Sequence, residues 1–323
     1  MKLVIAGFIF FFTQFASASL TKEELGKMLY FDPRLSVDGS VSCNSCHNVM
    51  GSGDDNRSFS MGVKGQLGGR SAPTVFNSAF YSVQFWDGRA KTLAEQAKGP
   101  LINPVEMGNK DHKQVIDRLA KIPGYVQMFK ELYGPKGLTI DNLAQAIELY
   151  EKTLTTINSP YDKFVAGDKK AMSDLAQKGW NTFQTVGCVT CHSGKNFAGP
   201  ELPLGVGFYM KFPTFENTEY DKKYQFTKDL GRFDVTKKEE DKHMFRVPTL
   251  RNVATTAPYF HNGSVMTLEE AVKVMAKTQL NKELKKDEIK SLVAFLSALT
   301  GTVPAQTLPV LPRTEGYIVT APQ

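Results

Sequence analysis

The spacing of apolar residues along the chain predicts a mainly helical protein with few short strands. In several stretches, apolar positions recur every three to four residues, which is the spacing of one buried helical face. Two of these stretches lead towards short motifs that contain cysteines. We expect helices over residues 21–30, 141–156, 172–184, 267–277 and 286–299.

Two of the predicted helices have recognisable starts. Asp141 is suited to cap the helix over 141–156. Thr267, followed by Glu269 and Glu270, is suited to cap the helix over 267–277. The buried stripe of the 141–156 helix would consist of Leu143, Ile147, Tyr150 and Leu154.

Two segments interrupt the helical pattern. The stretch 157–164, "INSPYDKF", breaks the periodicity and is expected to link two domains. Residues 301–323 are rich in proline and are expected to form an extended tail that packs on the surface. The prolines of this tail are Pro304, Pro309, Pro312 and Pro322.

Residues 1–18 have the composition of a secretory signal peptide. Lys2 gives a positive start, residues 3–12 are almost wholly apolar, and Ala16-Ser17-Ala18 forms a small-residue cleavage site. The apolar segment is shorter than a bilayer span, which favours cleavage over a membrane anchor. We therefore expect a periplasmic protein with no membrane anchor after cleavage.

Length and charge indicate the number of domains and the kinds of partner to expect. Roughly 305 residues would remain after cleavage, which is enough for two domains of ordinary size. The formal charge of +6 is spread along the chain and favours only weak steering of acidic partners. No stripe of Lys and Arg carries interleaved aromatic residues, so nucleic acid is not an expected partner.

The four cysteines indicate covalently bound haem. They occur as "CNSCH" at 43–47 and "CVTCH" at 188–192, so that Cys43, Cys46, Cys188 and Cys191 use up every cysteine. C-x-x-C-H is the attachment signature of c-type haem: two thiols bond to the porphyrin and the next residue ligates the iron. Two disulfides, a redox pair and a zinc site are weaker interpretations of this spacing. The sequence therefore predicts two haem c groups, with His47 and His192 as iron ligands.

A sequence repeat indicates an internal duplication. Residues 72–95 align with 247–270 at a constant offset of 175, and nine of 24 positions are identical. The haem motifs are offset by 145, so the second copy has about 30 extra residues, which we place within 200–246. We expect two cytochrome c-like haem domains, over 19–158 and 159–300.

Together these motifs resemble the bacterial dihaem cytochrome c peroxidases. The resemblance rests on both C-x-x-C-H motifs and on "QFWDGRA", "LAEQAKGP", "NPVEMG", "PYFHNGS" and "TLEEAV", and it spans nearly the whole mature chain. The wider family includes the dihaem enzymes that mature the tryptophylquinone cofactor of methylamine dehydrogenase. The resemblance implies reduction of hydrogen peroxide with electrons from a small cytochrome c or cupredoxin, and a homodimer.

The resemblance also implies roles for residues of the N-terminal half. The N-terminal haem would be the peroxidatic one, with Gln96 and Glu106 in its distal pocket. A carboxylate held over an open iron site can move a proton between the oxygens of peroxide, with a pKa raised by burial. Phe85 would border the pocket, and Trp86 would relay electrons between the haems.

In the C-terminal half the resemblance implies an electron-transfer haem with Met275 as its second axial ligand. A methionine ligand raises the potential of a haem and closes its sixth position. By residue type alone, His243, Met244, His261 and Met266 compete for this place.

The family also binds a calcium ion near the domain interface. The backbone carbonyls that match its site are those of Thr256 and Pro258. Ser71 stands where an asparagine commonly binds this ion. Calcium is therefore the third cofactor that the resemblance implies.

The sequence departs from the family pattern at Val63. Many members carry there a histidine that plugs the peroxidatic iron in the oxidised enzyme. No histidine lies between His47 and His112, although Met61 is nearby. We expect an N-terminal haem that is open without reductive activation.

Two other functions compete with the peroxidase. A dihaem carrier without catalysis would need both irons six-coordinate, and the N-terminal half offers no second strong ligand. An oxidase that modifies side chains of a partner protein is favoured by the missing plugging histidine. It is disfavoured by Met275, because the enzymes of this kind use a tyrosine in that place.

Overall fold

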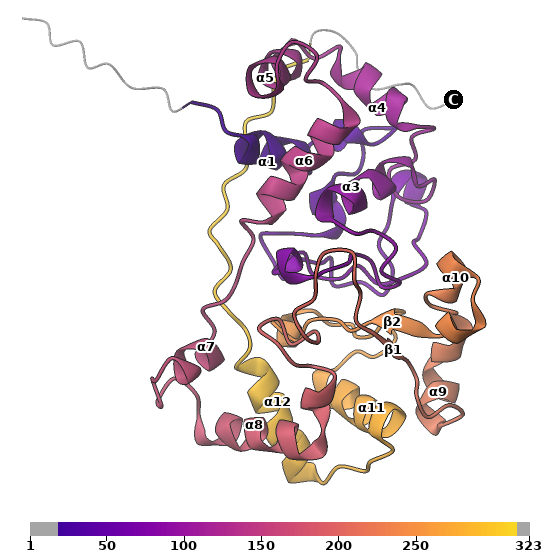
Figure 1. The fold of residues 1–323 in the computed structure, drawn as a ribbon, viewed down its shortest axis with the longest axis vertical. Coiled ribbons are helices and arrows are strands. Elements are labelled where there is room, and N and C mark those ends of the chain that lie inside the picture. Colours follow the sequence, from indigo (N-terminus) through magenta and orange to yellow (C-terminus); the bar gives the residue numbers. More distant parts are fainter. Residues whose placement is uncertain (1–18, 315–323) are drawn as a thin grey trace, which may run out of the picture.

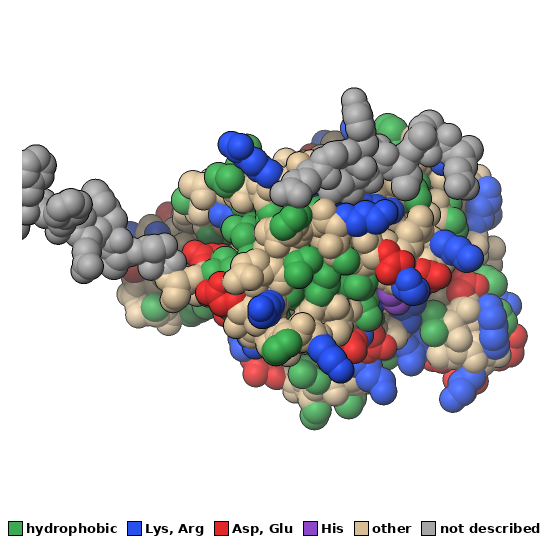
Figure 2. Space-filling model, turned by 90° about the horizontal axis from the view of Figure 1, so that it is seen from above, with side chains coloured by type: hydrophobic (Ala, Val, Ile, Leu, Met, Phe, Trp, Pro, Cys, Tyr) green, Lys and Arg blue, Asp and Glu red, His purple; other side chains and the backbone are tan. Residues whose placement is uncertain are grey.

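The computed structural model describes residues 19–314, so the predicted signal peptide and the end of the tail lie outside the described residues. Two helical bodies lie one above the other, and a two-stranded sheet lies between them (Figure 1). Strands β1 (Tyr209–Lys211) and β2 (Met244–Arg246) are antiparallel, with Met210 opposite Phe245. On the face seen in Figure 2, Lys and Arg side chains are scattered among acidic and apolar ones.

Helices account for most of the regular structure. The first body contains α1 (Lys22–Phe31), α2 (Cys43–Cys46), α3 (Leu93–Ile102), α4 (His112–Leu119), α5 (Pro123–Tyr133) and α6 (Ile140–Glu151). The second contains α7 (Pro160–Val165), α8 (Asp174–Val186), α9 (Glu219–Tyr224), α10 (Phe233–Thr236), α11 (Leu268–Leu280) and α12 (Lys286–Ser297). The five helices predicted from apolar spacing are all present.

Each body is built on one close crossing of two helices. A Cβ added at Gly26 of α1 would lie 1.8 Å from the carbonyl oxygen of Ala146 on α6. In the second body, a Cβ added at Gly179 of α8 would lie 1.9 Å from the carbonyl oxygen of Ser291 on α12. Because only glycine fits at either place, the two bodies repeat the same packing device.

The sequence repeat is also a structural repeat. The bridge between Gln84 and Ala90 recurs between Tyr259 and Val265, at the predicted offset of 175. Helices α3 and α11 then begin at equivalent threonines, which accept hydrogen bonds from the backbone three residues later. In both turns the aromatic residue has a positive φ, 69° at Phe85 and 72° at Phe260. The duplication therefore preserved a strained backbone as well as a sequence.

Two local predictions were wrong. The N-cap of α6 is Thr139, whose hydroxyl accepts from the Asn142 amide, while Asp141 lies in the first turn and pairs with Lys98. A threonine two residues earlier offered the same capping chemistry. The stretch 157–164 is not a plain linker, because Ser159 forms a capping box with Asp162 and starts α7.

The segment after α12 runs back along the first body, with no regular structure in its described part (Figure 1). Arg34 donates through Nη1 to the Pro312 carbonyl at 2.9 Å, and Tyr150 donates to the Gln306 side chain at 3.0 Å. The tail therefore fastens the C-terminal end of the chain to the N-terminal body.

The close crossing of α1 and α6 predicts a stability effect. Gly26→Ala should lower the free energy of unfolding by about 1–3 kcal/mol, because the new methyl group forces the two backbones apart. Gly69→Ala is the matched control, because a Cβ there meets nothing within 4 Å. Denaturant unfolding of the holoprotein measures both, and equal stability of the two variants would contradict this account.

Candidate active site

The first haem motif presents a neutral histidine to a cavity. Cys43–Cys46 form the short helix α2, and His47 follows as its C-cap. The His47 Nδ1 lies 2.9 Å from the carbonyl oxygen of Pro73. Since a carbonyl can only accept, Nδ1 carries the proton and Nε2 keeps its lone pair. Burial lowers the pKa of His47 and so favours the neutral form that ligates iron.

The second motif repeats this arrangement. Buried His192 lies with its Nδ1 3.0 Å from the carbonyl oxygen of Phe197. Burial also lowers the pKa of His192. In each motif a backbone carbonyl therefore sets the tautomer and the orientation of the ring, as is usual for metal-ligating histidines.

The cysteines and the space beside them fit covalent haem. All four thiols are free of disulfides and partly exposed. Cys43, Cys46 and His47 lie in the wall of a cavity of about 910 Å³, which is mostly apolar in its lining and has a few polar groups. Two unpaired thiols, a histidine lone pair and a large cavity are what a covalently attached haem requires. We conclude that the residues present fit the group.

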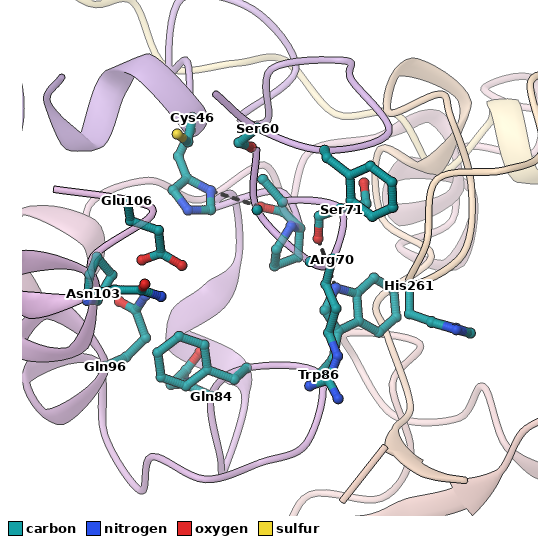
Figure 3. Close-up of a pocket in the computed structure, with 18 of the residues that line it drawn as sticks. Cys46, Ser60, Arg70, Ser71, Gln84, Trp86, Gln96, Asn103, Glu106 and His261 are labelled. Carbon is teal, nitrogen blue, oxygen red and sulfur yellow. Dashed lines mark hydrogen bonds between the residues drawn. The ribbon is translucent and has the colours of Figure 1, made fainter. Parts of the chain in front are cut away.

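Glu106 and two amide side chains face the same cavity. Figure 3 shows Glu106, Asn103 and Gln96 close together on one side of it. Burial raises the pKa of Glu106, while the charge of Arg89 and a hydrogen bond from Asn103 oppose the rise. The Arg89 guanidinium lies 3.5 Å above the Phe85 ring, which also lines the cavity. The arrangement can hold a small polar molecule and exchange a proton with it.

Trp86 lies where the two bodies meet. Its indole Nε1 donates to the Ser71 carbonyl at 2.8 Å, and its ring meets that of His261 edge to face at 6.4 Å (Figure 3). Arg246, from the second body, donates its backbone amide to the Trp86 carbonyl and its Nε to the Phe85 carbonyl. Backbone and side-chain contacts from both bodies thus fix this turn.

His261 is buried deeply at the same boundary. It is 2% exposed and stacks on Phe245 at 4.5 Å, and its Nε2 has no hydrogen-bond partner among the described residues. Burial is the main cause that lowers the pKa of His261, to about 4. A neutral ring therefore lies beside Trp86, and both contact the aromatic cluster of the second body that contains Phe212, Phe226 and Phe245.

Comparison with known proteins identifies the chain. Residues 20–170 match the family model of the di-haem cytochrome c peroxidases, and residues 245–280 match a RoxA-like, cytochrome c-like model. Cytochrome c551 peroxidase of Nitrosomonas europaea is 47% identical over 291 residues, which cover 90% of this chain and 83% of that protein. The chain belongs to the di-haem cytochrome c peroxidase family.

Other relatives support the same conclusion. Cytochrome c551 peroxidase of Pseudomonas aeruginosa is 46% identical over 90% of this chain and 82% of its own length. The methylamine utilization protein MauG of Methylophilus methylotrophus is 31% identical over 91% and 87%. A solved structure of a MauG-like protein associated with microbial copper homeostasis superposes with a TM-score of 0.73 at 25% identity, over 88% of this chain and 91% of that one.

This chain is therefore a cytochrome c peroxidase with two haem c groups, one on each C-x-x-C-H motif. The predicted mainly helical fold of two cytochrome c-like domains is confirmed. Among residues 19–314, the structure contains no helix with the length and apolar content of a membrane span.

Val63, predicted to match the family's plugging histidine, is turned away from solvent. Val63 is 1% exposed, and its backbone amide donates to the Glu106 carbonyl at 2.8 Å. A Cβ added at Gly108 would lie 2.7 Å from a Val63 methyl carbon, so the two are in close contact. Met61 is 45% exposed on the same loop.

Met275 lies on α11, partly buried against the aromatic cluster that includes Phe212 and Phe260. Of the competing residues, Met266 is largely exposed and His243 is buried with its Nδ1 2.8 Å from the Asp229 carbonyl. The axial role of Met275 remains a prediction from the family motif.

The analysis of the sequence did not identify three polar residues of the cavity. Asn103 stands three positions before Glu106 in the same motif, and this spacing was the one available signal. Arg89 stands in the motif "QFWDGRA" and contacts Asp87 and Phe85 of the same turn, whereas Arg246 reaches this turn from a segment that is distant in sequence. Periodicity and motif spacing carry no information on contacts of the second kind.

Proposed function

We propose that this enzyme reduces hydrogen peroxide to water at the N-terminal haem. Electrons would reach it through the C-terminal haem from a small c-type cytochrome or a cupredoxin, in the periplasm. The observation that carries the proposal is Glu106, a partly buried carboxyl of raised pKa that lines the cavity of the first haem motif. When bound, the haem supplies the redox-active iron of the reaction.

The cavity residues supply the proton chemistry. Reduction of one peroxide molecule consumes two electrons and two protons and yields two water molecules. Glu106 would take a proton from one oxygen of peroxide and deliver it to the other oxygen. The second oxygen could then leave as water. Gln96 and Asn103 orient the peroxide by hydrogen bonds, and Phe85 keeps that side of the cavity apolar.

Trp86 relays electrons between the two haems in this proposal. Its position between the cavity and the second body supports the role, as does the hydrogen bond that fixes its indole. Met275 and His192 would hold the iron of the C-terminal haem. That haem would then store electrons without reacting with peroxide.

The N-terminal haem is proposed to be open in the fully oxidised enzyme. A valine cannot ligate iron, and Val63 is packed against Gly108 with its amide bonded to the Glu106 loop. The Gln66 side chain adds a hydrogen bond to the Pro104 carbonyl at 3.0 Å. These contacts support a loop that is already in place before any electron arrives.

A calcium ion and a homodimer complete the proposal. Asn56 donates to the carbonyls of Thr255 and Ala257, on either side of Thr256. This leaves the Thr256 and Pro258 carbonyl oxygens for a cation that prefers oxygen ligands. Metal analysis and light scattering of the purified holoenzyme test these two parts.

An oxidase acting on a partner protein is the second candidate, because Val63 removes the plugging histidine. The higher identity to cytochrome c551 peroxidases than to MauG favours the peroxidase. Steady-state turnover of peroxide with a reduced monohaem cytochrome separates the two.

Glu106→Gln tests the acid–base role. The amide cannot accept and return the proton, so peroxide turnover should fall by about 10²- to 10⁴-fold. Glu131→Gln, an exposed carboxyl on α5, is the control and should keep full activity. Steady-state kinetics measure both variants. If Glu106→Gln kept more than roughly a tenth of the wild-type rate, Glu106 would have no acid–base role in the reaction.

Trp86→Phe tests the electron relay. Loss of the indole should lower kcat with donor cytochrome, because electrons then cross the boundary without the tryptophan. Trp180→Phe, in the separate core of the second body that contains Phe183 and Phe295, is the matched control for loss of an indole. Full turnover by Trp86→Phe would refute the assignment.

Electron paramagnetic resonance of the fully oxidised enzyme tests the open site. The N-terminal haem should show no second protein ligand. Val63→His should create a low-spin, bis-histidine signal at that haem. A low-spin N-terminal haem with two protein ligands in the wild-type enzyme would contradict the proposal.

A further inference from the structure

A second buried carboxyl lines the cavity of the first haem motif. Glu151 is the last residue of α6 and is 6% exposed. It belongs to the cavity wall, and its Oε2 has no hydrogen-bond partner among the described residues. The peroxide chemistry proposed above does not use it.

The neighbours of Glu151 do not compensate a negative charge. Tyr30 of α1 donates its hydroxyl to the His47 carbonyl at 2.6 Å, and Tyr150 donates its own to Gln306. Cys43 of α2 also lies near, since Glu151 contributes to the raised pKa of that thiol. Glu148, one turn earlier, is paired with Lys152 at 2.8 Å.

With no positive charge beside it, the carboxyl is favoured in its neutral form, whereas the positive charge of an oxidised haem would favour the carboxylate. Burial, and then the charge of Glu148, raises the pKa of Glu151 to about 8. A buried polar atom without a partner costs about 1–3 kcal/mol. The group is therefore a cost to the fold unless it acts on something that the cavity contains.

The second body shows that the fold does not need this carboxyl. The crossings of α1 with α6 and of α8 with α12 match atom for atom: Gly26 faces Ala146 and Tyr150, and Gly179 faces Ser291 and Phe295. Ala146 and Ser291 are 145 positions apart, as are Tyr150 and Phe295, so Leu296 of α12 occupies the position that matches Glu151. Leu296 is also 6% exposed and packs in the apolar core.

We propose that Glu151 is a proton-binding site of the N-terminal haem, which takes up a proton from water when that haem is reduced. Reduction removes one positive charge from a cavity of low dielectric, so the nearby carboxylate is stabilised less and binds a proton. The balance is one electron from the donor and up to one proton from solvent. The only bond formed is the O–H bond of the carboxyl.

The consequence is a midpoint potential that depends on pH. The potential of the N-terminal haem falls as pH rises, over the range between the pKa of Glu151 in the oxidised and in the reduced enzyme. The slope is at most about 59 mV for each tenfold change in proton activity, the value for one proton per electron. The C-terminal haem has Leu296 at the matching position, so its midpoint potential should lack this pH dependence.

Spectroelectrochemical titration of the holoenzyme tests the proposal, between about pH 5 and about pH 9, a range that brackets the ordinary and the raised carboxyl values. The wild-type N-terminal haem should show the slope, and E151Q and E151L should flatten it. E148Q, on the same helix, is the control and should retain it. An unchanged slope in E151Q, or a flat wild-type titration, would overturn the proposal.

An infrared difference spectrum gives a second measurement. The reduced-minus-oxidised spectrum should gain a protonated carboxyl band that disappears in E151Q. A band that persists in E151Q would assign the proton to another group. Both measurements rest only on haem attachment at Cys43 and Cys46 and need no turnover, so they fail or succeed independently of the peroxidase proposal.

Discussion

The whole molecule depends on one contact made twice: a backbone carbonyl that holds the Nδ1 of a haem-motif histidine. Pro73 makes it for His47 and Phe197 makes it for His192. The contact leaves Nε2 as the free lone pair of each ring, and in the first body that ring lies in the wall of the cavity. Each body combines this histidine with one helix crossing at a glycine and one turn at the boundary.

The two halves of the molecule share a backbone arrangement because of the duplication, but they differ in the residues at single matching positions. The two turns share their bridge and their positive φ, yet Trp86 of the first stands where His261 stands in the second. The ends of the two matching helices likewise differ, with Glu151 on α6 and Leu296 on α12. One backbone device therefore serves two haem sites whose surroundings differ in charge and in proton-binding groups.

Much of this could be predicted from the sequence, because it depends on local pattern. The haem motifs, the five helices and the repeat follow from spacing alone. The prediction of the α6 N-cap was wrong because Thr139 and Asp141 are chemically equivalent candidates two residues apart. The place of Arg246 at the cavity and the isolation of Glu151 depend on contacts between distant segments, which no single-sequence pattern records.

One buried and one partly buried carboxyl line the same cavity, and their charge affects how readily it accepts an electron. Burial raises the pKa of both Glu106 and Glu151, because neither finds enough positive charge to offset the loss of water. If both were ionised, the cavity would hold two negative charges, and electron arrival would be opposed. Protonation of a carboxylate as the electron arrives removes that opposition, in a reaction that consumes protons and electrons in equal number. The burial that raises the pKa of these carboxyls therefore couples proton binding in the cavity to the arrival of electrons.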